Sequence, residues 1–320
     1  MKPLSKQLLA IGFLLTAAIL IGGCIFIDGA NLKAKWEKAE DHTIPLASGT
    51  LIQVETHNGA IVTRGADTRQ CRVEAKIQVR AETEEIAQEI ANQTQILLQE
   101  ADQKLVIKLD KPSTREKHSI SVDYTITAPH QVSLHAVSHN GKLEFTDLQG
   151  DIDGKTHNGQ VACLLIQGAV SLETHNGDID CQEITGPVKV ITHNGEVKIL
   201  TVNAEPAAIE ANSHNGEIEC RDIRGDLNIE THNGQVIIVY SQAANSSPNV
   251  RAVTYNDNVH FTGPPGLSAQ VNLSTHNGSV HSSLPVKIQG ERSKHRIQGV
   301  IGNGEGTVEL QSHNGFIRIH

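Results

Sequence analysis

The sequence predicts an all-β protein, a right-handed parallel β-solenoid or β-helix-like array of two-strand repeats of about 18 residues. A four-residue phrase, Thr/Ser-His-Asn-Gly, occurs nine times, and its central copies are 18, 18, 18, 21 and 18 residues apart. Apolar and polar residues alternate on both sides of the phrase, as they do in short strands. The histidines of the nine copies are His57, His139, His157, His175, His193, His214, His232, His276 and His313.

One repeat, residues 186–203, illustrates the pattern. Val188, Val190 and Thr192 share one face before the phrase, and Val197 and Ile199 share one face after it. Each repeat is therefore predicted to contain two short strands of period two, joined by Asn-Gly.

The Asn-Gly dipeptide accepts positive φ and is a strong turn signal. In a hairpin it would reverse the chain, and the repeats would form meandering antiparallel sheets. In a solenoid it would form a corner, and each strand would pair in parallel with its counterpart one repeat later, at about 4.8 Å. An inward Asn could then hydrogen-bond to the Asn above and below, so the identity of the corner in every repeat favours the solenoid. The predicted turn residues are Asn58, Gly59, Asn140, Gly141, Asn158, Gly159, Asn176, Gly177, Asn194, Gly195, Asn215, Gly216, Asn233, Gly234, Asn277, Gly278, Asn314 and Gly315.

The N-terminus has the layout of a secretory signal peptide, residues 1–23. Two lysines precede an apolar run from Leu8 to Ile21, and small residues lead to Cys24. Residues 21–24 resemble the lipobox of bacterial lipoproteins, which implies that Cys24 is lipid-modified and that several acyl chains anchor the protein stably. A retained transmembrane helix is the alternative, but the 16 residues from Leu8 to Gly23 are fewer than the roughly 20 required. Ile25 in place of Asp implies an outer-membrane destination in a Gram-negative cell.

The charge and the composition of the chain limit the classes of molecule that it could bind. Without residues 1–23 the chain has 25 basic and 36 acidic residues and a formal charge of −11. An acidic chain lacks the electrostatic footprint of a nucleic-acid-binding protein, and an aromatic content of 3% provides few stacking platforms for bases or sugars. We expect no nucleic-acid partner and no cofactor.

Residues 24–43 are predicted to form a polar tether around Trp36, with an opening helix of the folded domain as the alternative. Residues 44–130 are predicted to form an N-terminal cap, because a solenoid exposes sheet edges at its ends. Within them, Glu82 to Asn92 is the one predicted helix, since Ile86 and Ile90 lie one turn apart among strong helix formers. Further strands are expected at 51–56, 72–80, 96–98, 105–109 and 119–127.

Residues 131–320 are predicted to form the solenoid. Cys163 and Cys181 are one repeat apart, so their Cα atoms could be about 4.8 Å apart, and an exported protein permits a disulfide at that distance. Alternatively, cysteine is a small apolar filler of the core, which we favour. The inward column comprises Val161, Ile179, Val197, Ile218 and Val236, and, two positions on, Cys163, Cys181, Ile199, Cys220 and Ile238.

The repeats loosen after Tyr240, and Tyr255-Asn256-Asp257 stands where His-Asn-Gly is expected. The chain stops at His320 inside a strand, so the C-terminal edge is either capped by residues 285–300 or open. An open edge would allow β-augmentation by a partner or by a second copy.

These features together resemble the bacterial β-strand-repeat family described as adhesins. The resemblance covers most of residues 45–320 and rests on the signal peptide, the single helix between N-terminal strands, the tandem Asn-Gly corners and the Gly-rich stretch Gly302 to Gly306 before the last strand. It implies an extracytoplasmic solenoid domain, and it supplies no catalytic residue.

The predicted function is therefore a non-catalytic interaction module, adhesin-like or scaffold-like, anchored to the cell envelope by lipid. Its flat faces would bind a protein or a surface glycan, and one end of the solenoid could mediate self-association.

Metal binding is the first alternative. The outward histidines form a row in which neighbours such as His157, His175 and His193 could share a zinc or copper ion. Zinc takes three or four ligands in tetrahedral geometry, and no cysteine or carboxylate shares the repeat's spacing to complete a site. A role for the histidine in the turn itself is the simpler interpretation.

A polysaccharide-active enzyme is the second alternative. Asp178, Glu196 and Glu217 share one outward column, and neighbours about 4.8 Å apart approach the separation of a retaining carboxylate pair. A solvated acidic face is the ordinary explanation, and we predict no enzymatic activity.

Overall fold

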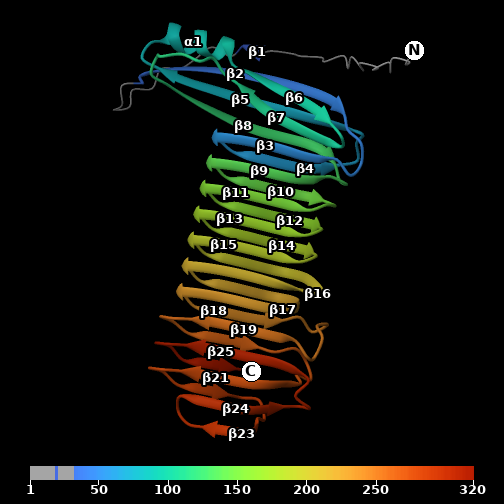
Figure 1. Ribbon diagram of the computed structural model, residues 1–320, viewed down its shortest axis with the longest axis vertical. Coiled ribbons are helices and arrows are strands. Elements are labelled where there is room, and N and C mark those ends of the chain that lie inside the picture. Colours follow the sequence, from blue (N-terminus) through green and yellow to red (C-terminus); the bar gives the residue numbers. More distant parts are fainter. Residues whose placement is uncertain (1–18, 21–31) are drawn as a thin grey trace, which may run out of the picture.

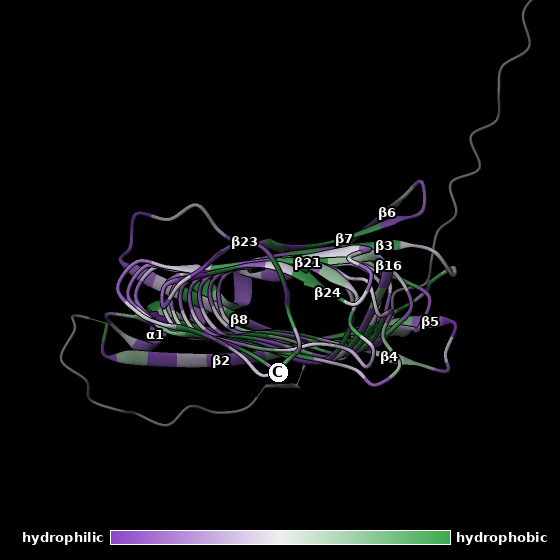
Figure 2. Ribbon diagram, turned by 90° about the horizontal axis from the view of Figure 1, so that it is seen from below, coloured by the Kyte–Doolittle hydropathy of each residue, from purple (hydrophilic) through white to green (hydrophobic). Residues whose placement is uncertain are grey.

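The computed structural model describes residues 19–20 and 32–320 and shows an elongated solenoid (Figure 1). Coils of two strands stack along the long axis, and each coil is flattened, so that two sheets enclose a narrow core (Figure 2). The predicted fold class, a parallel β-solenoid capped by a β-rich segment with one helix, is confirmed. None of the helices in the described part of the chain is long and apolar enough to cross a membrane.

The first face contains the strands that end at the His-Asn corner, and the second face contains the strands that begin after it. In stacking order, the first face comprises β3 (Leu51–Asn58), β9 (Ser133–Asn140), β11 (Ile152–Asn158), β13 (Val170–Asn176), β15 (Val188–Asn194), the second halves of β16 (Val197–Asn215) and β17 (Ile218–Asn233), β19 (Asn249–Thr254), β25 (Gly306–Ser312) and β21 (Ala269–Thr275). The second face comprises β4 (Ile61–Ala66), β10 (Leu143–Leu148), β12 (Val161–Gln167), β14 (Ile179–Thr185), the first halves of β16 and β17, β18 (Val236–Tyr240), β20 (Val259–Thr262), β26 (Ile317–Ile319) and β22 (Val280–Ser282).

Strands of successive coils pair in parallel and in register. Val161 is opposite Ile179, and Ile179 is opposite Val197, so equivalent residues of neighbouring repeats stack directly. The Asn-Gly dipeptide is consequently a corner between the two faces. Because consecutive strands of one coil lie on opposite faces, the alternative of meandering hairpins is wrong.

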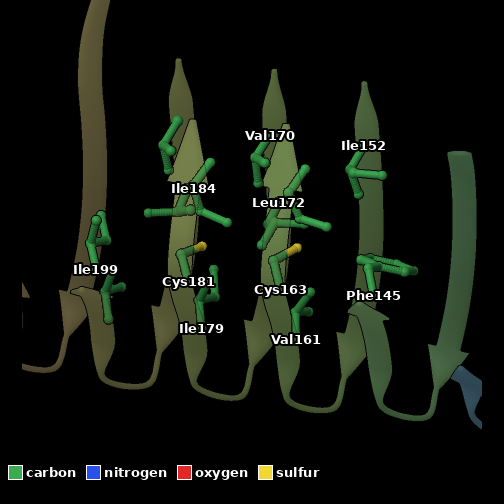
Figure 3. Close-up of a cluster of buried hydrophobic side chains, with 14 of the residues drawn as sticks. Phe145, Ile152, Val161, Cys163, Val170, Leu172, Ile179, Cys181, Ile184 and Ile199 are labelled. Atoms are coloured by element: carbon green, nitrogen blue, oxygen red, sulfur yellow. The ribbon is translucent and has the colours of Figure 1, made fainter. Parts of the chain in front are cut away.

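The core is filled by the inward residues of both faces. Val161 and Cys163 from the second face meet Val170 and Leu172 from the first face, and all four are buried (Figure 3). The predicted inward column is confirmed, since each of its ten residues is buried. The core is thin enough for one layer of side chains from each face.

The corner opposite the Asn-Gly corner has an unusual backbone. In five successive coils one non-glycine residue near this corner has a left-handed conformation. The residues and their φ angles are Asp147 (60°), Leu165 (59°), Glu183 (55°), Thr201 (54°) and Asp222 (52°). This conformation brings Cβ too close to the following carbonyl oxygen, and it is least favourable for a β-branched residue such as Thr201.

The N-terminal cap is inserted after the first coil. Residues 51–66 already form a complete coil, because β3 and β4 pair in parallel with β9 and β10. The chain then leaves the solenoid and returns at β9, so the predicted cap boundaries of 44–130 are wrong at residues 51–66. The added strands are β5 (Gln70–Ala81), β6 (Gln95–Ala101), β7 (Lys104–Asp110) and β8 (His118–Pro129), and they extend both faces beyond the first coil.

Residues 34–43 are not a tether or a helix. They belong to β2 (Ala34–Pro45), which pairs antiparallel with β5 and is joined at residues 38–39 by the short β1 (Ile19–Leu20). The strand was missed because Lys38, Glu40 and His42 take inward positions, where an apolar residue is expected. Residues 24–31, the rest of the predicted tether, lie outside the described residues, as does most of the predicted signal peptide.

The predicted helix is confirmed as α1 (Glu84–Gln93). Thr83 is its N-cap, and its hydroxyl accepts a hydrogen bond from the amide of Ile86. Ala87, Ile90 and Ala91 face the core and are buried. The helix lies over β2 and β5 and covers that end of the solenoid (Figure 1).

A largely buried polar cluster joins β2 to α1. The Lys38 ammonium donates to the carbonyl oxygen of Thr94, at the end of α1, and lies 2.8 Å from a Glu40 carboxylate oxygen. The other oxygen of Glu40 accepts from the amide of Ile96 and from His42. Burial alone would raise the pKa of Glu40, but the hydrogen bonds from Lys38, His42 and Ile96 outweigh it and lower the pKa.

The C-terminal end has an exchanged order of coils. The last strands in the chain, β25 and β26, lie between the coil formed by β19 and β20 and the coil formed by β21 and β22. A hairpin of β23 (Lys287–Arg292) and β24 (Arg296–Ile301) then covers the edge of β21. Of the two alternatives for this end, the capping by residues 285–300 applies to the first face, whereas β22 has a neighbour on one side only among the described strands.

We predict that Thr201→Asn stabilises the protein by about 1 kcal/mol, because asparagine tolerates the left-handed conformation better than a β-branched residue. Urea denaturation of the variant and the parent measures the difference. Thr185→Asn, on an exposed strand position without positive φ, is the matched control and should give no gain. An equal gain in both variants would contradict the backbone explanation.

We predict that Glu40→Gln lowers the free energy of unfolding at neutral pH by about 2 kcal/mol, since it removes a charge that Lys38 and His42 need. Because folding lowers the pKa of Glu40, its carboxylate stabilises the fold above the unfolded value of 4.5, and this contribution is lost as the pH falls through the folded pKa. The difference between variant and parent should therefore shrink as the pH falls below 4.5. Exposed Glu100→Gln is the control, and a Glu40→Gln effect that stays constant as the pH falls below 4.5 would sink the explanation.

Candidate functional site: a column of exposed aromatic rings

The corner histidines stack face to face in one continuous column along the solenoid. Neighbouring ring centroids lie 4.5–4.9 Å apart, and their planes differ by 2–14°. All of these side chains are exposed except that of His313, which is half-buried. We call this set the ring column; in stacking order it comprises His57, His139, His157, His175, His193, His214, His232, Tyr255, His313 and His276.

Tyr255 takes the place of a histidine in the column, as the sequence Tyr255-Asn256-Asp257 in place of His-Asn-Gly indicates. It replaces histidine in the coil of β19 and β20, and its ring is 4.7 Å from His232 and 4.5 Å from His313. His313 precedes His276 in the column because the C-terminal coil is inserted before the coil of β21. The imperfect phrase Tyr255-Asn256 was the available signal.

An amide ladder runs beside the rings. Each corner Asn donates from Nδ2 to Oδ1 of the Asn in the preceding coil, at 2.7–2.8 Å, in nine consecutive hydrogen bonds from Asn58 to Asn277. The ladder itself matches the prediction, but its position does not. Apart from the partly buried Asn58, these side chains are exposed, because the inward position of the corner belongs to the Thr or Ser two residues earlier.

The buried hydroxyls form the third ladder. Thr174 donates to the carbonyl oxygen of Gly159, and Thr192 to that of Gly177, at 3.0 and 2.9 Å. Equivalent bonds occur at the other coils of the array. The hydroxyls thus satisfy carbonyl groups that the turn would otherwise leave unpaired.

The corner glycine is required by close packing between coils. A Cβ added to Gly195 would lie 1.9 Å from the carbonyl oxygen of Gly177, which is far inside van der Waals contact. The predicted reason, a positive φ, is wrong for the array, since among the corner glycines only Gly59 has a left-handed φ, of 126°.

The stacked arrangement does not favour the metal sites considered for His157, His175 and His193. Their ring centroids are 4.7 and 4.8 Å apart, whereas two nitrogens on one zinc ion are separated by at most about 4.2 Å, twice the Zn–N bond length. In stacked rings the nitrogen lone pairs also lie side by side in the ring planes. In the described part of the chain, no group of three or more His, Cys, Asp or Glu side chains is arranged to hold a metal ion.

The carboxylates considered for catalysis lie on the second face, next to the corner. Asp178 accepts a hydrogen bond from the amide of Glu196, and Glu196 forms an ion pair with Lys198 at 3.2 Å. The pKa of Glu217 is raised by partial burial and then by repulsion from Glu219 and Glu196. Two of the three carboxylates thus have structural partners, and the third is held in a row of like charges.

The four cysteines of the described residues are buried free thiols. Cys163 and Cys181 occupy adjacent inward positions, as predicted, and are not bonded to each other. Burial raises the pKa of Cys71 and Cys220 to about 12 and that of Cys163 and Cys181 further. These thiols are therefore core filler. The predicted lipidation site, Cys24, lies outside the described residues.

Comparisons with known proteins identify a family. Residues 50–320 match the family described as Toastrack DUF4097. Comparison with curated proteins finds no significant match.

Three similar solved structures have low TM-scores. A proposed adhesin from Bacteroides fragilis has 15% identity, a TM-score of 0.42 and coverage of 88% of this chain and 97% of that chain. A proposed adhesin from Parabacteroides merdae has 10% identity, a TM-score of 0.35 and coverage of 88% and 96%. A proposed lipid-binding protein from Parabacteroides distasonis has 10% identity, a TM-score of 0.32 and coverage of 88% and 96%.

We predict that Gly195→Ala lowers the free energy of unfolding by about 2 kcal/mol or more, because the methyl group must push two coils apart. Thermal denaturation measures the loss. Gly290→Ala is the control, since its Cβ would meet only the flexible side chain of Gln298. Similar stability of both variants would refute the packing explanation.

Proposed function

This chain belongs to the Toastrack DUF4097 family, and from that premise we propose that it is a non-catalytic interaction module of the cell envelope, adhesin-like or scaffold-like, whose partner binds along the ring column. The partner is a protein or a surface glycan. The observation that carries the proposal is the column itself, ten stacked rings, nine of them exposed, at 4.5–4.9 Å on one edge of a solenoid.

The column is suited to binding because it is rigid before a partner arrives. Each ring is fixed by the rings above and below it, and each corner is fixed by the amide and hydroxyl ladders. A preorganised surface loses little conformational entropy on binding. Identical groups repeated along one edge also allow an extended partner to make many weak contacts at once, which raises the overall affinity.

The side chains beside the column differ from coil to coil and would provide specificity. On the first face, the positions two residues before the rings are Glu173, Ile191 and Glu230 in three of the central coils, and Ile191 is 37% exposed. On the second face, Asp178, Glu196 and Glu217 lie just past the corner. The central coils therefore combine stacked rings with carboxylates, which suits a partner that carries amide, hydroxyl or cationic groups.

The cellular location is part of the proposal and rests on the sequence. The apolar run before Cys24 and the lipobox-like residues 21–24 support export and a lipid anchor at the N-terminal end. In a Gram-negative cell the anchor would be in the outer membrane. The ring column would then extend away from that membrane.

Site-specific photocrosslinking in intact cells tests the function. A photoreactive residue replaces Ile191, beside the column, or Leu165, at the opposite corner, and both native positions are exposed. We expect one recurrent partner, protein or glycan, at position 191 and not at position 165. The same products from both positions, or none at position 191, would contradict binding along the column.

Two double variants distinguish a role of the rings in binding from a role in folding. His175→Tyr with His193→Tyr keeps the stack, as Tyr255 does, and removes the imidazole nitrogens. His175→Ala with His193→Ala removes the rings altogether. We expect the alanine pair to lose the crosslink at position 191 by tenfold or more, as for loss of a binding hot spot, while circular dichroism of both pairs stays that of the parent.

A further inference from the structure

The end of the solenoid opposite α1 has the opposite charge to the rest of the chain. We call residues 258–320 the distal tip. The distal tip has five Lys and Arg and three acidic residues, a formal charge of +2, and it also contains six histidines. Residues 24–257 have 20 basic and 33 acidic residues, a formal charge of −13.

Among the described residues, the cations of the distal tip have no acidic side chain within ion-pair distance. No ion pair within the described residues involves Lys287, Arg292, Lys294, Arg296 or Arg318. By contrast, six of the seven Lys and Arg residues in 131–257 form ion pairs within 4.0 Å. The positive charge at the distal tip is therefore available to an external anion.

The second face of the distal tip carries one of the five cations, Arg318, beside several histidines. Arg318 lies in register between His260 and His281, and its guanidinium carbon is 4.5 Å from the centre of the Phe316 ring. The pKa of His260 is lowered by burial and then by the positive charges of Arg318 and His320. His281, Phe316, Arg318 and His320 line a shallow groove at the edge of this face.

The other four cations lie in the hairpin of β23 and β24, in which β23 pairs with β24. All six residues of β23 are exposed, including Ile288 at 38%. Lys287 precedes Ile288, Arg292 ends the strand, and Lys294 follows it, with Glu291 as the one acidic residue among them. The strand forms the extremity of the molecule, opposite α1 and β2 (Figure 1).

An exposed apolar side chain among unpaired cations fits an anionic lipid surface better than a soluble anion. Each Lys or Arg near an anionic bilayer contributes favourable electrostatic energy, and an apolar side chain gains by entering the headgroup region. A small anion would instead require a cavity in which several donors converge.

We infer that the distal tip binds the anionic headgroups of a phospholipid bilayer, through Lys287, Arg292 and Lys294 around Ile288 and through Arg318 on the second face. The inference takes from the proposed function only the lipid anchor at the N-terminal end. It adds a second membrane surface, which the distal tip would contact. The acidic body between the two ends would keep the rest of the solenoid off that bilayer.

A vesicle-capture experiment tests the inference with the full chain. The protein is reconstituted through its N-terminal end into phosphatidylcholine nanodiscs, and capture of fluorescent vesicles is measured. We expect capture of vesicles made of equal parts phosphatidylglycerol and phosphatidylcholine, and at least tenfold less capture of pure phosphatidylcholine vesicles. Equal capture of both would overturn the inference.

Charge reversal locates the binding surface. Lys287→Glu, Arg292→Glu and Lys294→Glu together should reduce capture of the anionic vesicles at least tenfold. The matched control is Lys104→Glu, Lys108→Glu and Lys111→Glu, which changes the net charge equally at the opposite end of the solenoid. Unchanged capture by the tip variant, or an equal loss in the control, would overturn the inference, and thermal denaturation verifies that both variants are folded.

Two further readouts make the outcomes distinct. In the first readout, inorganic polyphosphate is added as a competitor and its own binding to the protein is measured. If polyphosphate abolishes vesicle capture and binds saturably and more tightly than the vesicles do, the ligand is a phosphate polymer and the lipid assignment is overturned. The crosslink at position 191 should persist in the tip variant, because the ring column is untouched. Failure of that crosslink with intact vesicle capture would count against the proposed function and leave this inference standing.

Discussion

The close contact between successive Asn-Gly corners is the constraint on which the rest of the structure depends. Except at the coil of β19 and β20, where Asp257 takes the position, the corner glycine of one coil approaches the carbonyl oxygen of the glycine in the adjacent coil so closely that no Cβ fits between them. This contact fixes the register of neighbouring coils at the spacing of paired strands. Once the register is fixed, the Thr hydroxyl, the Asn amide and the His ring of every coil meet their equivalents, and three ladders form together.

Because the coils stack in register, an outward residue that recurs in every repeat forms a continuous row on the surface. A histidine repeated at the corner becomes a column of stacked rings, whereas a carboxylate repeated just past it becomes a row of like charges, which is destabilising. The row of Asp178, Glu196 and Glu217 is relieved locally, by Lys198 and by a backbone amide. The surface therefore retains a repetitive chemistry along one edge, and that edge is where an extended partner gains most from many equivalent contacts.

The two ends of the solenoid solve the problem of unpaired edges in different ways. At the N-terminal end, β7 and β8 pair in parallel with the edges of the two faces, further antiparallel strands follow, and a helix covers the end. A largely buried cluster of Lys38, Glu40 and His42 joins β2 to α1. At the other end, the hairpin of β23 and β24 extends the first face and carries unpaired cations, and β22 leaves a short edge on the second face. The contrast between an acidic body and a basic tip gives the molecule a direction, which suits a module that is attached at one end and makes contacts along its length and at the other.

The sequence by itself determined the repeat, the two strands of each coil, the inward columns and the helix near residues 82–92, because alternation and spacing report local chain geometry directly. It also placed the nine histidines at equivalent corners, with Tyr255 where another histidine is expected. Tertiary structure alone decided that residues 34–43 form a strand, that His313 lies between Tyr255 and His276, and that glycine is required for close approach instead of a positive φ. Each of these three features depends on which segment, distant in the sequence, lies alongside. Lys38 and Glu40 are polar, so their inward positions cannot be recognised from the sequence until the groups that they contact are known. Local patterns encode period and face, but the order of neighbouring coils is set by packing between segments far apart in the chain.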